Sequence, residues 1–173
     1  MANIKVSEMP TTTSVNDEDY IMLVQNNTSK KIAMEDLEKY NKNIMTASLT
    51  NNYTLISSGT YEQLTLSFSE NIGNNLSIDT GGIKCSKVGY VKVSAKLSFN
   101  SCGAGLKWLT IYKNTTAISA MPFNTTTNRI TLSIPPILVP VSTNDVFYMS
   151  VQGSSGDIVR NNSSYTEMTV EYI

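Results

Sequence analysis

The feature that most limits the possible folds of this chain is a regular alternation of apolar and polar side chains over residues 91–99. A period of two residues is typical of a β-strand with one face in the core and one face in water. The apolar positions are Val91, Val93, Ala95, Leu97 and Phe99, and the polar positions are Lys92, Ser94, Lys96 and Ser98. The sequence therefore predicts a long strand in a sheet that is covered on one side.

The chain from residue 53 onward has the same β character throughout. Short apolar runs alternate with polar turns, which predicts about seven to ten short strands and no helix in this region. The stretch "LKWLTIYKNTTAISA" predicts a hairpin with its turn at residues 113–116. Pro135, Pro136 and Pro140 interrupt an apolar run, so part of that run must be an edge strand or a loop. Together these patterns predict a mainly β protein with a jelly-roll β-sandwich.

Composition and charge limit the classes of partner that we expect for this protein. The net charge of the 173-residue chain is −1, which indicates neither nucleic-acid binding nor attraction to an anionic membrane. No apolar stretch is long enough to span a bilayer, so we expect no membrane insertion. The opening "MANIKVSEMP" lacks the apolar core of a signal peptide. We therefore expect the protein to be assembled in a cytoplasm, with Cys85 and Cys102 as free, half-buried thiols.

The first fifty residues predict a small separate segment. The stretch "DYIMLVQNNTSKKI" predicts a hairpin with a turn at Asn26–Ser29, and a lone two-stranded hairpin is marginal in water. A short helix should follow, with one stripe at heptad-like spacing formed by Met34, Leu37, Asn41 and Ile44. The chain is thus expected to divide into residues 1–50 and residues 51–173.

A helix of this length needs a partner to be stable. Three copies around a common axis would bury the stripe, and Asn41 would act as a register device in such a bundle. The alternative is a monomeric helix that folds back on the neighbouring domain. Self-association is the favoured interpretation because the segment has no other obvious partner within the chain.

Nothing in the sequence indicates catalysis. The chain has no histidine, which removes the commonest general base and the commonest metal ligand. No pair of acidic residues can be assigned the separation of a glycosidase from sequence alone. The "NDED" stretch at residues 16–19 lacks the glycine and final glutamate of a calcium loop, so a solvated turn is favoured. We expect a protein that is not an enzyme and that holds no cofactor or metal.

The C-terminal region resembles the tumour necrosis factor and complement globular-head domains. The resemblance rests on "GGIKCSKVGYVKVSAKLSF", on the hairpin "LTIYKNTTAIS", on "VSTNDVFYMSV" and on the final "SYTEMTVEYI". In the third of these, Asn144 stands where the family typically has a glycine. The resemblance covers residues 53–173, and it implies a ten-stranded jelly roll that forms threefold trimers.

The same resemblance suggests an interface. In the trimers of this family, the sheet nearest the axis contains the Gly-Tyr strand and the terminal strand side by side. We expect their polar faces to meet across strands or across protomers, and the alternative is that they point to solvent. The side chains concerned are Lys92, Ser94, Lys96, Glu167, Thr169 and Glu171.

The N-terminal region carries a second, independent resemblance. The stretch "VSEMPTTTSVNDEDYIMLVQNNTSKKIAMEDL" is similar to the amino-terminal segment of many fibre and head- or tail-appendage proteins of tailed bacteriophages. Met9 and Met34 replace residues that are commonly leucine or another aliphatic there. In that family the segment trimerises and links an outward-facing head to the virion.

Both resemblances imply a homotrimer. We expect a structural virion protein of a tailed phage, a fibre or appendage held to other virion proteins by its N-terminal segment. Its jelly-roll head would bind a bacterial cell-surface glycan or decorate the capsid. The alternative is a secreted-type, cytokine- or complement-like trimeric ligand domain.

Two groups of residues are candidates for receptor binding. Three polar loops at residues 100–105, 122–128 and 153–164 are long enough to form a distal receptor surface. Aromatic side chains stack on sugars, and the candidates are Trp108, Tyr112, Phe123 and Tyr148. Packing in the core is the default expectation for each of these four.

Overall fold

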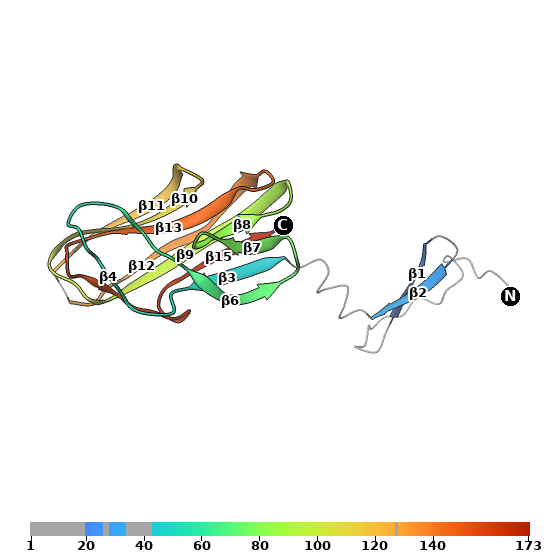
Figure 1. The fold of residues 1–173 in the computed structure, drawn as a ribbon, viewed down its shortest axis with the longest axis horizontal. Helices are drawn as coiled ribbons and strands as arrows, with labels where there is room; N and C mark the ends of the chain where they lie inside the picture. Colours follow the sequence, from blue (N-terminus) through green and yellow to red (C-terminus); the bar gives the residue numbers. More distant parts are fainter. Residues whose placement is uncertain (1–19, 26–27, 34–42, 127) are drawn as a thin grey trace. The chain divides into compact units, whose positions relative to one another are not determined.

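The computed structural model describes residues 20–25, 28–33, 43–126 and 128–173. The chain divides into two compact units, Met1–Asn41 and Lys42–Ile173, which are coloured along the sequence in Figure 1. The described residues form strands and contain no helix, so the mainly β prediction is confirmed. None of them belongs to a helix that could cross a membrane.

The first unit contains the predicted hairpin. Strand β1 (Tyr20–Gln25) pairs antiparallel with β2 (Thr28–Ala33), and Gln25 stands opposite Thr28 at the turn. The helix expected next has Met34, Leu37 and Asn41 on its stripe, and these three positions lie outside the described residues.

The prediction that Ile44 lies on a helix is wrong. Ile44 opens strand β3 (Ile44–Ser48), which pairs with one strand on each side. Met45 and Ala47 are fully buried while Ile44 and Thr46 are half-buried, which is a strand pattern. The two ladders and the core burial outweigh the local helical spacing. The structure thus places residues 42–50 in the second unit, whereas the sequence analysis assigned them to the N-terminal segment.

The second unit is a sandwich of two antiparallel sheets (Figure 1). The smaller sheet has the order β11-β10-β13-β8-β7, with β5 also paired to β13. Its strands are β5 (Glu62–Gln63), β7 (Leu76–Asp79), β8 (Gly82–Cys85), β10 (Gly105–Lys113), β11 (Thr116–Thr125) and β13 (Val146–Gln152). The larger sheet has the order β4-β14-β9-β15-β3-β6, with β12 also paired to β9. Its other strands are β4 (Tyr53–Thr54), β6 (Ser67–Ile72), β9 (Gly89–Ser101), β12 (Thr131–Val141), β14 (Ile158–Val159) and β15 (Glu167–Tyr172).

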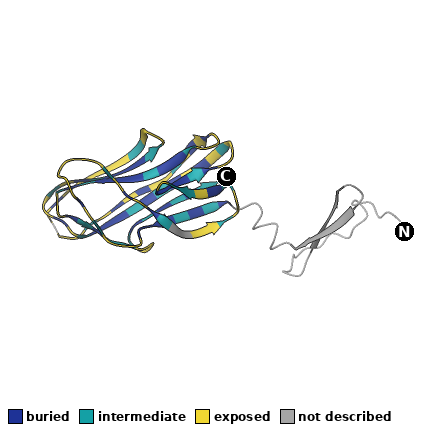
Figure 2. Cartoon of the chain, viewed as in Figure 1, coloured by how far each residue is buried: buried dark blue, intermediate teal, exposed yellow. Residues whose placement is uncertain are grey.

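The core lies between the sheets, and several strands, β9 among them, alternate buried residues with more exposed ones (Figure 2). Strand β9 contributes the predicted apolar set, and all five of those side chains are buried. From the smaller sheet the core receives Leu109, Ile111, Phe147, Met149 and Val151. The jelly-roll interpretation is therefore confirmed, and the alternation over residues 91–99 is its clearest signature.

The prolines of β12 and Asn144 stand at positions whose backbone geometry accommodates them. Strand β12 pairs only with β9, and its register shifts between Ile134 and Ile137, at Pro135 and Pro136. This confirms an edge strand, since a bulge accommodates residues that cannot donate a backbone hydrogen bond. Asn144 has a φ of 73°, a left-handed conformation that asparagine tolerates, which explains how it replaces the glycine common in the resembling family.

Neither cysteine forms a disulfide, and both are buried rather than half-buried. Cys85 lies on β8 and Cys102 follows β9. Burial raises the pKa of both thiols, so neither is an activated nucleophile.

A buried ion pair ties the loops at one end of the sandwich. Lys107 Nζ lies 2.7 Å from Asp157 Oδ2, and the two side chains are 0% and 3% exposed. The other carboxylate oxygen of Asp157 accepts a hydrogen bond from the backbone N–H of Gly103 at 2.9 Å. Lys107 Nζ also donates to Ser154 Oγ at 3.2 Å. The pair therefore links two separate chain segments, residues 103–107 and 154–157, and is itself buried.

We predict that Asp157→Ala lowers the free energy of unfolding by about 3–5 kcal/mol, because it leaves the Lys107 ammonium buried without a counter-charge. The matched control is Asp79→Ala, which breaks the part-exposed pair with Lys84 and should cost at most about 1 kcal/mol. Denaturant titration of both variants measures the difference. Equal losses in the two variants would contradict the structural role assigned to Asp157.

Candidate functional site

The predicted interface residues are brought together on the outer face of the larger sheet. Strands β9 and β15 are neighbours, and their register sets Lys96 opposite Glu167, Ser94 opposite Thr169 and Lys92 opposite Glu171. Lys96 Nζ lies 3.1 Å from Glu167 Oε1, and both side chains are about one-third exposed. The two polar faces therefore meet across strands within one protomer. Contact with a second protomer stays a prediction.

Strand β3 extends this face on the side of β15 away from β9. Thr46 and Thr169 share a hydrogen bond between their hydroxyls at 3.0 Å. Ile44 stands opposite Glu171 on one side and Ile72 on the other. Ile44 thus lies on the face proposed for the interface, although it reaches that face from a strand and not from a helix.

Two large apolar side chains on this face were missed by the sequence analysis. Tyr90 is 55% exposed and Leu138 is 59% exposed, and Leu138 stands directly opposite Lys92. Pro140 pairs with Tyr90 in the same ladder. The alternation that places Lys92 outward also places Tyr90 outward, so Tyr90 could have been identified. Leu138 follows the bulge, where the alternation is broken.

A second apolar surface lies along the edge strand β11. Met121 and Phe123 stand opposite Leu109 and Lys107 of β10, so all four side chains share the inward face of the sheet. Leu109 and Lys107 are fully buried, but Met121 and Phe123 remain 36% and 48% exposed. The sandwich therefore leaves an uncovered apolar edge under β11.

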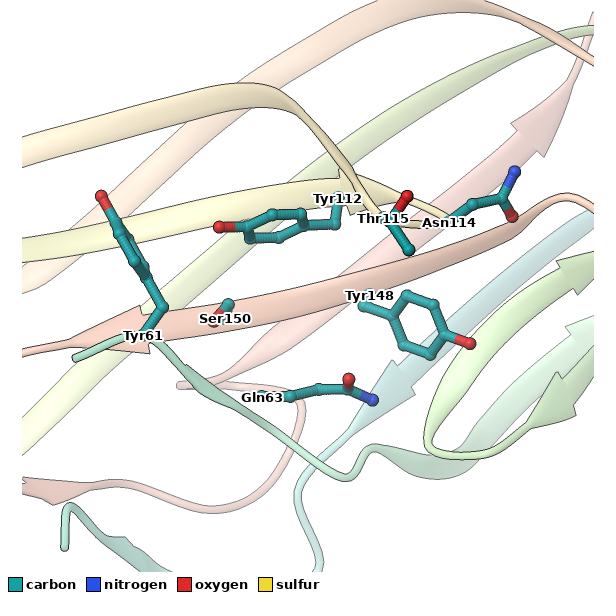
Figure 3. Close-up of a pocket in the computed structure, with 7 residues that line it drawn as sticks. All are labelled: Tyr61, Gln63, Tyr112, Asn114, Thr115, Tyr148 and Ser150. Atoms are coloured by element: carbon teal, nitrogen blue, oxygen red, sulfur yellow. The ribbon is translucent and has the colours of Figure 1, made fainter. Parts of the chain in front are cut away.

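A groove is hollowed into the outer face of the smaller sheet (Figure 3). Its volume is about 350 Å³, and its seven lining residues are Tyr61, Gln63, Tyr112, Asn114, Thr115, Tyr148 and Ser150. The rings of Tyr61 and Tyr112 meet edge to face, with centroids 6.5 Å apart. Strands β10 and β13 supply the floor, because Tyr112 pairs with Tyr148 in their ladder.

Several groove side chains are held in place by their neighbours. The Tyr148 hydroxyl shares a hydrogen bond with the Thr80 hydroxyl at 3.1 Å. A Cβ at Gly82 would lie 2.7 Å from a Tyr148 ring atom, so the ring depends on a glycine beneath it. Asn114 accepts from the Val146 backbone N–H and donates to Asp145. These contacts fix the groove before any ligand arrives.

The loop that carries Tyr61 is organised by Glu62. The Glu62 carboxylate accepts hydrogen bonds from the backbone N–H groups of Ile56 and Ser57 and from the Tyr53 hydroxyl at 2.7 Å. Burial alone would raise the pKa of Glu62, but these hydrogen bonds together lower it. Burial, followed by the hydrogen bond to this carboxylate, raises the pKa of Tyr53 to about 12.

The expectation that the four candidate aromatic residues pack in the core is wrong. Trp108, Tyr112 and Tyr148 are half-buried, and Phe123 is exposed. In β10 and β13 the inward positions are taken by residues such as Leu109 and Met149, so the intervening aromatic side chains point away from the core. Tyr61 was missed, because it precedes a two-residue strand that shows no alternation.

The three segments predicted as receptor loops approach one another at one end of the sandwich, although residues 122–125 belong to strand β11 and not to a loop. The Cys102 N–H donates to the Asn128 carbonyl at 3.0 Å, and the Gly103 N–H donates to the Asp157 carboxylate. At the other end of β9, the Ile173 N–H donates to the Tyr90 carbonyl. Receptor binding by the loops stays a prediction.

The described ranges contain no group of three or more acidic, cysteine or histidine residues that could hold a metal ion. The absence of catalysis stays a prediction, because no finding bears on it.

Comparisons with known proteins show the fold. No family model and no curated protein match the sequence. Crystal structures of murine APRIL at pH 5.0 and pH 8.0 align with TM-scores of 0.65 and 0.61, at 5% and 6% identity, over 76% of this chain and 99% of that chain. The vertex protein P5 of phage PRD1 aligns with a TM-score of 0.54 at 14% identity, over 76% of this chain and 96% of that protein. APRIL belongs to the tumour necrosis factor family, so the second unit has a jelly roll like that of this family.

We predict that Glu62→Gln destabilises the protein more near pH 7 than near pH 3. A carboxylate whose pKa is lowered on folding stabilises the native state above its ordinary pKa of 4.5, and this stabilisation disappears as the pH falls through the folded value. Chemical denaturation should show a loss of about 1.5 kcal/mol at the higher pH.

The matched control for this change is Glu70→Gln, on an exposed position of β6. It should alter the free energy of unfolding by at most about 0.5 kcal/mol at either pH. A loss in Glu62→Gln that is the same at both pH values would contradict the role given to the carboxylate.

Proposed function

We propose that this chain is a homotrimeric structural protein of a tailed-phage particle, with the jelly-roll head facing outward and the N-terminal unit attached to the virion. The observation that carries the proposal is the joining of two units in one chain. A hairpin too small to be stable alone precedes a head whose fold is similar to that of a phage vertex protein. The N-terminal resemblance to phage appendage proteins supports the same assignment.

The two exposed apolar surfaces support self-association. Met121 and Phe123 lie on the β11 edge, while Tyr90 and Leu138 lie on the outer face of the larger sheet. When two different patches of one protomer meet on its neighbours, the contact is heterologous and closes into a ring if the rotation allows. The resemblance to tumour necrosis factor trimers supports a threefold ring. In it, Lys92, Ser94, Lys96, Glu167, Thr169 and Glu171 would line the surface nearest the axis.

The chain termini of the second unit lie at one end of the sandwich and the loops at the other, which supports attachment of the head to the virion through one end. The Tyr172 N–H donates to the Asn43 carbonyl at 2.8 Å, so the start and the end of the second unit lie together. The converging loops lie at the opposite end of β9, beyond Ser101. A trimer built on a common axis would therefore present its loops away from the virion. There they would contact the host surface or decorate the capsid, without catalysis.

A second candidate function is a cytokine-like trimeric ligand, and the alignment with murine APRIL favours it. The two functions differ in where the protein is found. Antibody against the head should label intact phage particles under the first proposal. Particles of the producing strain that carry no label would favour the second.

We predict that the full-length protein has a solution mass of about three times the 19.0 kDa of one chain. Light scattering on a sizing column measures it. A truncated protein that begins at Lys42 keeps the whole head and should also be trimeric. A trimer only at full length would place assembly in the N-terminal unit, and a monomer in both would contradict the proposal.

We predict that Phe123→Asp and Leu138→Asp each dissociate the truncated trimer, because an unpaired carboxylate in the interface costs about 2–5 kcal/mol. Both residues are exposed in the single protomer, so the fold itself should persist, as thermal unfolding monitored by circular dichroism will show. The matched control is Ile56→Asp, at a loop position that is 76% exposed. Trimers that survive both changes would place the interface elsewhere.

A further inference from the structure

We infer that the groove on the outer face of the smaller sheet is a binding site for a short neutral saccharide. The inference rests on the proposed host-surface function and assigns it a site and a ligand class. The groove is formed by three tyrosines from separate segments, with amide and hydroxyl side chains between them (Figure 3).

The lining chemistry selects the ligand class. Tyrosine rings offer flat apolar faces to the C–H groups of a sugar ring, and their hydroxyls remain available for hydrogen bonds. Gln63, Asn114, Thr115 and Ser150 add donors and acceptors around these rings. A few polar groups placed among apolar walls is the usual make-up of a small-molecule site. A ligand that combines apolar ring faces with many hydroxyls matches this lining.

The charges near the groove are already paired, which favours a neutral ligand. None of the seven lining residues is charged. Behind Asn114, the Asp145 carboxylate lies 3.3 Å from Lys113 Nζ and also accepts from the Ser142 N–H. Beside Tyr61, Glu62 is held by hydrogen bonds from its own loop. An anionic saccharide would find no unpaired cation among the lining residues.

A buried hydroxyl lies next to the floor of the groove. Thr110 stands directly opposite Ser150 across the β10–β13 ladder, one outward-facing pair along from Tyr112 and Tyr148. Its hydroxyl is buried and has no hydrogen-bond partner among the described residues. Such a group carries a desolvation cost unless a partner reaches it. Thr110 is not one of the seven lining residues, so the saccharide assignment rests on the groove lining itself.

The size and place of the groove fit a short saccharide bound from outside the trimer. Its volume of about 350 Å³ is near the lower end of the range for small-molecule sites. It lies on the outer face of the smaller sheet, whereas the proposed interface face belongs to the outer side of the larger sheet. These two faces lie on opposite sides of the core, and the other proposed contact, at Met121 and Phe123, lies on the inward face of β11 and not on the groove face.

Saturation-transfer NMR on the full-length protein tests the inference with four neutral probes: maltose, lactose, cellobiose and N,N′-diacetylchitobiose. Transfer to at least one probe is expected. Tyr61→Ala and Tyr112→Ala should each raise the dissociation constant for that probe at least about tenfold. Tyr112→Phe keeps the ring and should retain most of the affinity. The matched control is Tyr165→Ala, which removes a ring that stacks on Arg160 away from the groove and should leave binding unchanged.

Each result supports or overturns the site. No transfer to any of the four probes overturns it, and so does a probe that binds equally well to wild type and to Tyr112→Ala. Stronger transfer to 3′-sialyllactose than to lactose overturns the neutral class. Binding of the protein to host cells, measured in parallel, distinguishes failure of the saccharide site from failure of the proposed function. If cells are bound while the probes are silent, the receptor function stands and the site fails; if a probe binds but particles carry no label, the site stands and the virion function fails.

Discussion

The pairing of strand β9 with β12, β14 and β15 is the interaction on which the rest of the second unit depends. Through these ladders β9 joins the edge strand, the terminal strand and the loop segment that carries β14. Its inward residues form the middle of one core layer, and its outward residues lie on the proposed interface face. Because side chains alternate strictly along a strand, a shift of one residue in β9 would exchange these two faces.

The two sheets differ in what they present to the outside. The larger sheet shows a polar network in which Lys96 pairs with Glu167 and Thr46 with Thr169, bordered by Tyr90 and Leu138. The groove on the outer face of the smaller sheet is lined by uncharged tyrosine, amide and hydroxyl side chains. The proposed contact between protomers uses the larger-sheet face together with the β11 edge, whereas the proposed ligand site uses the outer face of the smaller sheet. The core between the sheets keeps the two surfaces apart.

Different polar contacts hold the two ends of the sandwich. At the loop end, Lys107 and Asp157 replace apolar packing with an ion pair that ties two chain segments together. Such a pair contributes little net stability, but removal of one partner is costly. At the opposite end the Tyr172 hydroxyl donates to the Lys87 carbonyl, and the chain enters at Asn43 beside the terminal strand. The ion pair therefore holds the loops at one end of the sandwich, while the chain enters and ends the second unit at the other end.

The sequence by itself determined the β class, the inward and outward faces of β9, the edge position of β12 and the N-terminal hairpin, because alternation, prolines and turns act locally. Only the tertiary structure decided the state of Ile44, whose helical spacing lost to two strand ladders. It also decided the burial of Lys107, which depends on a carboxylate fifty residues away. The groove likewise unites Tyr61, Tyr112 and Tyr148 from distant segments, and no local pattern encodes such a meeting. Periodicity specifies which face a residue occupies, whereas long-range pairing specifies what that face meets.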